Sequence, residues 1–416
     1  MQSKTLGAVL IITGTCVGAG ILALPLSTAG LGFVPTAFAL GINWLISLVT
    51  ALLLVEVLAA LKTKNINFDS MCEKTLGRPG QVICMIAYLV LLYSVSSAYL
   101  SGGTSMLSAL LQQNHIELPY WVSSLVFTSV LGAVVYTGHR AVDVANRSLL
   151  SVKGVSFIVL AALIMPDVTQ ANLFQFHQTV PYLWFAIPVL FFAFGFQIVV
   201  PSMYTYLEQD IKQLRLAIVF GSLIPLFLYT LWICVTLGIL PRFGPVSYSS
   251  FLHDHTSGDV GALFAMLGSQ GSQGSQHWSH LVMNVFTNVA VTTSFLAVTM
   301  ALKDYVSDVF RLDAETRKGK NLAAAATYLP PLALVLFAPT LFQKALDYAS
   351  ASLAVVLIFL PVAMAVAVRR QQRAAKVTSS FKVAGGTVLL SVLCLFGVAL
   401  LVLSFMASLN MLPVLH

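Results

Sequence analysis

The chain alternates long apolar stretches with short polar connections. A helix needs about 20 mostly apolar residues to cross the hydrocarbon core of a bilayer, and eleven stretches meet this requirement. They cover approximately residues 5–29, 31–61, 82–113, 121–138, 148–166, 181–206, 213–240, 279–303, 321–339, 344–368 and 384–408. The pattern predicts an all-α integral membrane protein with eleven transmembrane helices.

Composition strengthens this prediction. Of the 416 residues, 58% are hydrophobic and 9% are charged, and the mean hydropathy is +0.89. A soluble domain carries about 25% charged residues, so a water-facing surface cannot be built from this chain and a soluble enzyme is excluded. The net charge of +7 does not indicate a nucleic-acid partner, because the basic residues fall in short runs between the apolar stretches.

The distribution of Lys and Arg predicts how the helices are oriented. Cytoplasmic connections of membrane proteins carry an excess of both residue types. If the N-terminus is cytoplasmic, 20 of the 22 Lys and Arg residues lie in or next to inside segments, and only Arg242 and Lys344 lie outside. We therefore expect the N-terminus inside and the C-terminus outside.

Two of the eleven stretches contain helix-breaking residues at mid-depth. The first has Gly14, Gly18 and Gly20, and the sixth has Gly195 between prolines at 188 and 201. Non-helical backbone inside a membrane is tolerated only where it is buried or lines a cavity. Broken helices at corresponding places of two inverted halves point to the binding site of a secondary transporter. Ordinary helix packing through glycine is the alternative interpretation.

Unwound backbone in both stretches suits a zwitterionic ligand. Helix N-termini favour a carboxylate and helix C-termini favour an ammonium group, so an amino acid matches two broken helices. No Arg or Lys lies in either break, which disfavours a polyanion. Phenylalanines at 191, 192, 194 and 196 surround Gly195 and favour an apolar or aromatic ligand side chain, although phenylalanines in spans usually face lipid or neighbouring helices.

At this point the sequence resembles the hydroxy and aromatic amino acid permeases, a bacterial family that includes tyrosine-specific and tryptophan-specific transporters. The motifs that carry the resemblance are GTCVGAGILALP at 14–25, YSVSSAYLSGG at 93–103, FGFQIVVPS at 194–202 and TSFLAVTMALKDYVSD at 293–308. The similarity runs through the whole chain. One departure is Gln197, where the family pattern more often has His, so a histidine-based proton role does not carry over.

The resemblance implies the inverted-repeat core of the amino acid–polyamine–cation superfamily, with five plus five helices as in the bacterial leucine transporter, and one extra helix. Residues 1–166 would form the first repeat. Residues 181–368 would form the second repeat, with a long outside loop at 241–280. Residues 384–416 would form the eleventh helix and the C-terminus.

The resemblance also implies the site residues. Main-chain groups of the substrate would bind to the first break, and its side chain would lie against the sixth stretch. The implied substrate-binding residues are Gly14, Thr15, Gly18, Ala19, Gly20, Tyr99, Phe194, Gly195 and Gln197, with Tyr93 as a further candidate. Packing is the alternative for the tyrosines, and hydrogen bonding to unwound backbone is the alternative for Gln197.

Uphill transport needs a driving force, and the sequence contains no Walker-type motif for ATP. Ionisable residues within spans are functional candidates. Lys153 lies about 7.5 Å into the fifth stretch at 1.5 Å per residue, where burial favours the neutral amine and lets it load and release a proton. A fifth-helix lysine in some proton-coupled relatives of the superfamily lies where sodium binds in others. A lysine that snorkels to the surface is the alternative.

Three other polar residues in the spans bear on coupling. For Glu56 we expect a structural role, as a partner for unwound backbone, rather than a proton site. Thr293 and Ser294 place hydroxyls at mid-span, and such a pair resembles a sodium site in sodium-coupled relatives. Hydroxyls also satisfy helix backbone routinely.

Cysteines and histidines predict neither a disulfide framework nor a metal site. The five cysteines form no CxxC pair. Four histidines lie in the predicted outside loop with a spacing that fits no standard ligand pattern, and they are His253, His255, His277 and His280. We expect no cofactor.

The sequence therefore predicts a permease that imports an aromatic amino acid, with tyrosine favoured, by proton symport across the bacterial inner membrane. Its expected partners are the substrate, a coupling proton and the lipid bilayer, with no nucleic acid and no obligatory protein partner. Tryptophan transport, a broader neutral amino acid carrier and sodium coupling are the alternatives. A channel lacks a visible filter motif, and a membrane-embedded enzyme lacks converging catalytic side chains.

Overall fold

A computed structural model of the chain describes residues 3–63, 66–174, 180–254, 259–270, 276–312, 316–339, 341–375, 381–413 and 415. The protein is all-helical over these residues, with 85% of the chain in helix and no strand in the described part. The side chains of Ser3, Ala19 and Asp254 are not described, and His255 lies outside the described residues.

Within the described residues, ten helical segments are long and apolar enough to cross a membrane, and two helices that meet at an angle of 47° count as an eleventh span if they are taken together. This bent span consists of α1 (Ser3–Cys16) and α2 (Ala19–Thr28). The other spans are α3 (Phe33–Leu61), α4 (Phe68–Gln113), α5 (Tyr120–Thr137), α6 (His139–Ile164) with η1 (Met165–Asp167), α8 (Val180–Phe192) with η2 (Phe196–Val199) and α9 (Val200–Tyr206), α10 (Ile211–Ile239), α13 (Gln276–Val309), α14 (Arg317–Phe337), α15 (Phe342–Ala354) with η3 (Val355–Phe359) and α16 (Leu360–Ala375), and α17 (Gly386–Ser408). Each overlaps one predicted apolar stretch, but α4 begins at Phe68 and not at 82, with a kink at Gly77 (φ 74°, ψ −168°), and α6 begins at His139 and not at 148.

Three shorter helices complete the fold. They are α7 (Gln170–Leu173), α11 (Tyr248–Asp254) and α12 (Val260–Gly268). The predicted outside loop at 241–280 is thus partly helical, because α12 has an apolar face. Leu263, Phe264 and Leu267 on that face are buried, and the ring of Phe264 packs against Trp232 of α10 with a centroid distance of 6.0 Å.

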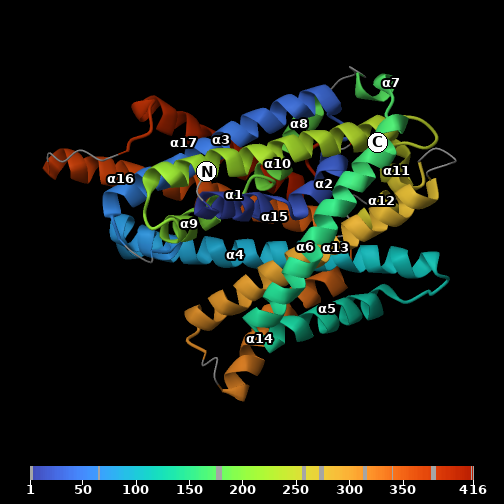
Figure 1. The fold of residues 1–416 in the computed structure, drawn as a ribbon, viewed down its shortest axis with the longest axis horizontal. Coiled ribbons are helices and arrows are strands. Elements are labelled where there is room, and N and C mark those ends of the chain that lie inside the picture. Colours follow the sequence, from blue (N-terminus) through green and yellow to red (C-terminus); the bar gives the residue numbers. More distant parts are fainter. Residues whose placement is uncertain are drawn as a thin grey trace.

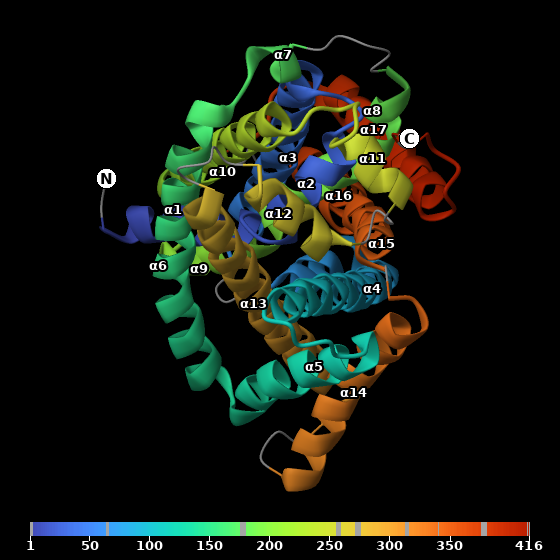
Figure 2. The same cartoon turned by 90° about the vertical axis from the view of Figure 1, so that its right-hand side faces the viewer.

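Helix α4 lies at the centre of the bundle. It packs against α13 and α15, and α13 packs in turn against α6. In both Figure 1 and Figure 2, α5 and α14 lie on the opposite side of α4 from α1, α3 and α10. Helix α1 packs closely against α10, because Gly221 leaves room there for Ile12. This arrangement buries α2, most of α8 from Phe185 onwards, and part of α9 inside the bundle.

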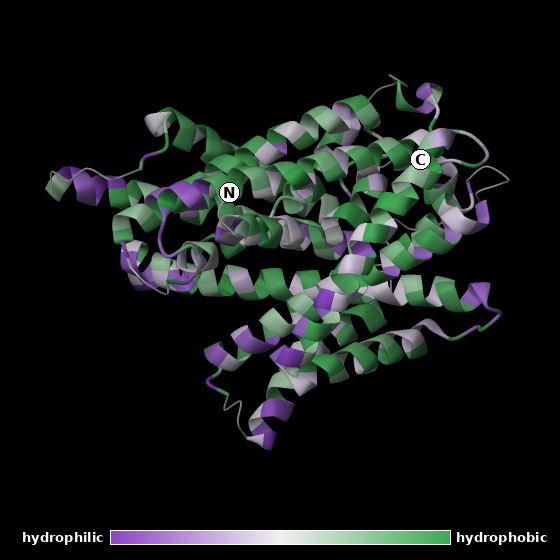
Figure 3. Cartoon of the chain, in the orientation of Figure 1, coloured by the Kyte–Doolittle hydropathy of each residue, from purple (hydrophilic) through white to green (hydrophobic). Residues whose placement is uncertain are grey.

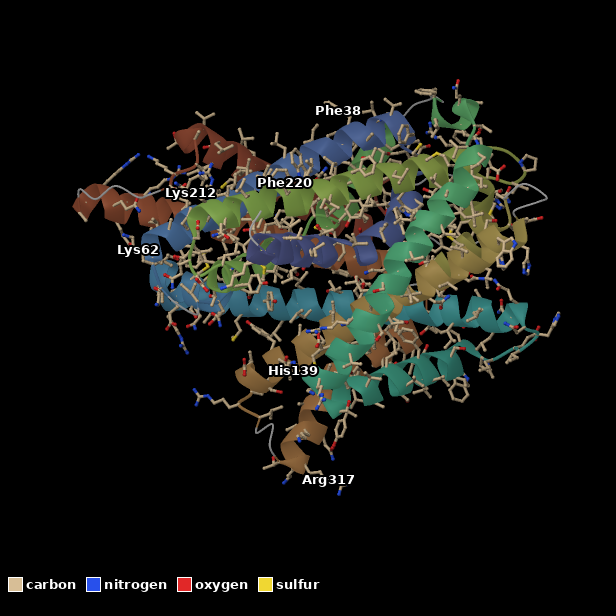
Figure 4. The ribbon with its side chains drawn as sticks, viewed as in Figure 1. Phe38, Lys62, His139, Lys212, Phe220 and Arg317 are labelled. Carbon is tan, nitrogen blue, oxygen red and sulfur yellow. The ribbon has the colours of Figure 1, made fainter. Side chains whose placement is uncertain are left out.

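The surface has the pattern expected of a protein that spans a bilayer. Figure 3 shows apolar residues along the middle of the helices and polar residues towards the helix ends. In Figure 4, Lys62 and Lys212 lie at one end of the bundle, and Phe38 and Phe220 project from its flank. Phe38 is 74% exposed. An apolar flank with polar ends matches a multi-pass membrane protein.

Candidate functional site

The first span is interrupted between Cys16 and Ala19. Gly18 has a φ of −140° and a ψ of −128°, which ends the helical hydrogen-bond pattern. Side chains of other helices satisfy the freed carbonyl groups. The hydroxyl of Tyr229 donates to the Cys16 carbonyl at 2.5 Å, and the ammonium of Lys153 donates to the Val17 carbonyl at 3.0 Å.

The sixth span is interrupted between Phe192 and Phe196. Two tight turns cover the gap, in which the amides of Phe194 and Gly195 donate to carbonyls three residues earlier, both at 3.1 Å. The 3₁₀ helix η2 then leads into α9. Only part of this break therefore depends on side chains from elsewhere.

The two breaks meet inside the bundle. The hydroxyl of Tyr229, which bonds to the first break, also donates to the Ala193 carbonyl of the second break at 2.9 Å. A Cβ added to Gly20 would lie 2.7 Å from the Cα of Ala193, so the two backbones approach as closely as glycine allows. The Tyr229 hydroxyl thus links the two interrupted spans, and Gly20 allows their backbones to touch.

Two predicted site residues on other helices also lie at the first break. A Cβ added to Gly18 would lie 2.5 Å from the hydroxyl oxygen of Tyr99 and 3.2 Å from the Oγ of Ser294. Tyr99 belongs to α4 and is buried, and Ser294 belongs to α13. The break is therefore enclosed by polar groups from two neighbouring helices.

The aromatic residues around Gly195 are mostly buried in the bundle. Phe191, Phe194 and Phe196 are fully buried. The Phe194 ring meets the Tyr229 ring edge-on with a centroid distance of 5.4 Å, whereas Phe191 packs against Phe396 of α17 at 5.8 Å. Of the three, Phe194 lies closest to the junction of the two breaks.

Gln197 is buried and turned towards α3. Its side-chain amide donates to the Ser47 carbonyl at 3.2 Å and to the Thr50 hydroxyl at 3.1 Å. Its Oε1 has no hydrogen-bond partner among the described residues. These contacts tie the second break to α3.

Other predicted residues lie farther from the junction or point away from it. Gly14 and Thr15 are exposed, and the Thr15 hydroxyl donates back to the Ile11 carbonyl at 2.8 Å. Tyr93 donates to the Ala326 carbonyl of α14 at 2.9 Å. The Thr293 hydroxyl donates to its own helix, at the Val289 and Ala290 carbonyls.

The two ionisable residues singled out in the spans have different surroundings. Lys153 is 6% exposed and contacts the first break directly. Glu56 is fully buried and forms a bidentate ion pair with Arg369 of α16, at 2.7 and 2.8 Å. It also accepts a hydrogen bond from the backbone N–H of Val383 at 2.8 Å. The partners of Glu56 are therefore the Arg369 guanidinium and the Val383 backbone N–H, and both lie outside the two breaks.

Cavities lie towards both ends of α4. One of about 180 Å³ lies beside η2 and α9, which follow the second break, and its lining includes Ile198, Pro201, Ser202, Tyr88 and Tyr305. The other, of about 580 Å³, lies near the C-terminal end of α4. Its lining includes Ser105, Gln112, Tyr120, Asp259 and Pro339. Among the described residues, no group of three or more His, Cys, Asp or Glu side chains has the arrangement of a metal site.

Sequence reasoning missed Tyr229 and its neighbour Trp232, which donates to the Ile21 carbonyl of α2 at 2.7 Å. A signal was present, because both residues carry a polar atom inside the apolar stretch 213–240 and lie three residues apart, on one face of a helix. Which backbone they would reach was not readable from the sequence.

Comparison with known proteins identifies the family. The tryptophan/tyrosine permease family matches residues 1–404. The chain is 33% identical to tyrosine-specific transport system 2 of Haemophilus influenzae, over 100% of this chain and 99% of the relative. It is 31% identical to the tryptophan-specific transport protein of the same organism, over 97% and 96%, and 28% identical to glutamine transporter 2 of Aliivibrio fischeri, over 97% and 99%. The chain belongs to the tryptophan/tyrosine permease family.

Proposed function

We propose that this permease imports tyrosine across the bacterial inner membrane by proton symport. The observation that carries the proposal is the junction of the two interrupted spans at Tyr229, beside Gly18 and Tyr99. Unwound backbone from two spans offers N–H and carbonyl groups to a zwitterion at one place. Relatives named as tyrosine-specific and tryptophan-specific transporters support an aromatic substrate.

In this proposal the first break binds the main-chain groups of the substrate. Gly18, Ala19 and Gly20 supply backbone, and Tyr99 closes the site from α4. Gly14 and Thr15, one turn earlier and on the inner side of the break in the proposed topology, would contact the substrate as it leaves towards the inside. Phe194 and Gly195 form the wall for the aromatic ring, and Gln197 holds that wall in place through its bonds to α3.

An inverted repeat, with the N-terminus inside and the C-terminus outside, is part of the proposal. Its support is that the helix–helix contacts of the first five spans have counterparts among those of the next five. If the five spans from α1 to α6 correspond in order to the five from α8 to α16, the contact of α6 with α13 maps onto that of α15 with α4. The contact of α1 with α10 likewise maps onto that of α8 with α3. The cavities at the two ends of α4 fit access from either side.

Lys153 is the proposed proton carrier because it links α6 to the first break. Its charge bears directly on the Val17 carbonyl, so gain or loss of a proton changes a contact at the substrate site. A ligand shifts a conformational equilibrium only through such differential contacts. Transport would follow from substrate and proton each favouring a different arrangement of the broken spans.

Uptake of labelled tyrosine into liposomes containing the purified protein tests the proposal. A pH gradient of about one unit stores about 1.4 kcal/mol per proton, which supports about tenfold accumulation at one proton per substrate. We expect accumulation driven by protons, blocked by unlabelled tryptophan and phenylalanine but not by leucine. Preference for tryptophan would overturn the tyrosine assignment alone. Accumulation with sodium only would overturn proton symport and move coupling to Thr293 and Ser294.

Lys153→Gln tests the coupling residue. We expect the variant to exchange tyrosine without a gradient but to lose proton-driven accumulation. Lys303→Gln is a matched control, because Lys303 of α13 also donates to a backbone carbonyl, that of Val135 at 3.0 Å, away from both breaks. Proton-driven accumulation that survives in Lys153→Gln would make Lys153 a structural residue.

A further inference from the structure

Asp347 is a buried carboxyl group that neither the fold nor the proposed site explains. It lies in the second turn of α15 and is 1% exposed. Its Oδ1 has no hydrogen-bond partner among the described residues, and the ion pairs of the described chain do not include it. Glu56, the other buried carboxyl group described above, has both an arginine and a backbone N–H.

The helices around Asp347 offer no compensating charge. Helix α15 packs against α4, α8 and α17. Helices α8 and α17 contain no charged residue, and those of α4 all lie at 69–78, in its first turns. The groups that act on the Asp347 carboxyl are the amide of Gln343 and the half-buried ammonium of Lys344, both on α15.

Tyrosines on the neighbouring helices face other groups. Tyr99 lies at Gly18, and Tyr93 bonds to the Ala326 carbonyl. Tyr88 meets the Tyr305 ring edge-on, and Tyr182 of α8 packs on Gly30. Tyr348, the next residue along α15, is exposed. A carboxylate without a cation is unstable in such surroundings, and the neutral carboxylic acid is favoured.

Asp347 lies on the face of α15 that contacts both broken spans. Gln343, Asp347 and Ser350 are spaced by four and three residues and so share one helix face. The Ser27 hydroxyl of α2 donates to Gln343 at 3.2 Å. The Ser350 hydroxyl donates to the Pro188 carbonyl of α8 at 2.9 Å. Asp347 lies between these two contacts, one to each interrupted span.

We propose that Asp347 is a proton-binding residue that couples the protonation of α15 to the arrangement of α2 and α8. The inference rests on the proposed proton symport and adds a second site to Lys153. A proton from water binds to a carboxylate oxygen, and the neutral acid is the form that the closed packing accommodates. When α2 or α8 separates from α15 and water enters, the O–H bond breaks, the proton leaves to water and the carboxylate is hydrated.

The chain position of Asp347 gives this site a direction. In the proposed topology, α15 starts at the outer surface, so Asp347 in its second turn lies near that surface, whereas Lys153 lies near the middle of α6. A proton from outside would therefore meet Asp347 first. The two groups act near opposite ends of α2: Lys153 contacts Val17 in the break that precedes this helix, and the Asp347 face contacts Ser27 near its C-terminus.

Asp347→Asn tests the site, because the amide has nearly the shape of the neutral acid and cannot release a proton. Three quantities are measured in liposomes or detergent: tyrosine exchange without a gradient, accumulation under an inward proton gradient, and protons taken up per tyrosine bound in weakly buffered solution. We expect exchange within about twofold of wild type, loss of the roughly tenfold accumulation, and fewer protons per tyrosine. Asp304→Asn, at the far end of α13, is the control for removal of a carboxyl group and should match wild type.

The outcomes separate this site from the proposed function. Wild-type protein that fails to accumulate tyrosine under a proton gradient contradicts both. Wild-type symport with Asp347→Asn accumulating tyrosine normally overturns the Asp347 site alone. Loss of exchange together with accumulation in folded Asp347→Asn makes Asp347 a structural residue and also overturns it. If the Asn variant does not fold, Asp347→Glu decides: a moved carboxyl group should shift the pH at half-maximal uptake, and an unshifted profile rejects the site.

Discussion

The two interrupted spans differ in what satisfies their free backbone groups. At the first break, side chains from α6 and α10 bond to the carbonyls of Cys16 and Val17, and Trp232 bonds to Ile21 just beyond. At the second break, the chain forms its own tight turns and a 3₁₀ helix. Among the described residues, Tyr229 is the side chain that bonds to both breaks.

The difference indicates which break responds to its surroundings. Buried carbonyl groups need partners. The Cys16 carbonyl also accepts a hydrogen bond from the Gly18 amide at 2.8 Å, whereas the Val17 carbonyl depends on Lys153 of α6, so the first break depends more on its neighbours. The second break keeps much of its hydrogen bonding when its neighbours move. A movement of a neighbouring helix should therefore change the conformation of the first break more than that of the second, which is the more rigid part of the site.

Gly20→Ala should have the largest effect on stability and uptake, because the added methyl group would separate the two breaks where they touch. Its Cβ would lie 2.7 Å from the Cα of Ala193, and backbone cannot yield as a flexible side chain can. We expect a loss of about 1–3 kcal/mol in stability and loss of tyrosine uptake, measured by thermal unfolding in detergent and by transport.

Substitutions at two further glycines serve as comparisons for Gly20→Ala. Gly195→Ala should cost less, because the nearest atom to its Cβ is the Phe192 carbonyl oxygen at 3.3 Å. Gly41→Ala on α3 meets nothing within 4 Å and should behave as wild type. Equal effects at Gly20 and Gly195 would show that the two breaks are packed alike.

Tyr229→Phe should have the next largest effect. It keeps the ring packed on Phe194 but leaves the Cys16 and Ala193 carbonyls without this donor, which costs about 1–3 kcal/mol and should lower uptake by about tenfold. Tyr248→Phe is the control, since that buried hydroxyl bonds to the Thr236 carbonyl on the α10–α11 side of the bundle. Similar uptake in both variants would show that the Tyr229 hydroxyl has no specific role in transport.

Gln197→Leu should change stability without changing substrate preference. The amide bonds to the Ser47 carbonyl and the Thr50 hydroxyl of α3. The Ser47 carbonyl keeps a hydrogen bond from the Thr50 hydroxyl at 3.0 Å, so loss of the amide should cost about 0.5–1.5 kcal/mol. Competition by tyrosine and tryptophan should keep its wild-type ratio. A changed ratio would place Gln197 in the substrate pocket instead.

Asp210→Ala should have the smallest effect, at the segment that follows the second break. The Asp210 carboxylate caps α10, and hydrogen bonds from the backbone and side chain of Gln213 hold its pKa below its usual range. The substitution should cost about 1 kcal/mol at neutral pH.

The pH dependence of that cost has a definite sign. A lowered native pKa stabilises the fold above the ordinary aspartate pKa of about 4, and the contribution disappears as pH falls through the native value. Thermal unfolding of wild type and Asp210→Ala should therefore converge in acid. Asp210→Asn, which keeps the cap at every pH, should stay close to wild type at neutral pH, and a large loss there would contradict the cap.

The sequence was sufficient for the spans and the breaks, because both depend on local composition. Apolar runs and glycine clusters set where a helix crosses and where it stops. The two helices within 241–280 were missed because they are short and their burial depends on α10 and α13.

Side-chain partners were less predictable, because they depend on which face of a helix meets which neighbour. The approach of Tyr99 to Gly18 follows from the crossing of α4 and the first span, and the 3₁₀ turn of η2 directs Gln197 to α3. Asp347 stands only three residues inside its apolar stretch, where a carboxyl group looks like the end of a span. Its burial comes from tertiary packing.

The ion pair between Glu56 and Arg369 has a mechanical consequence. Separating these buried groups would leave two uncompensated charges, at a cost of about 3–5 kcal/mol, so α3 and α16 act as one lever. Helix α15, which contacts both broken spans, is joined to α16 through the π-helical turn η3 at Val355–Phe359. Such turns have an irregular hydrogen-bond ladder. If α15 tilts during transport while α16 stays paired with α3, we expect the helix to bend at η3.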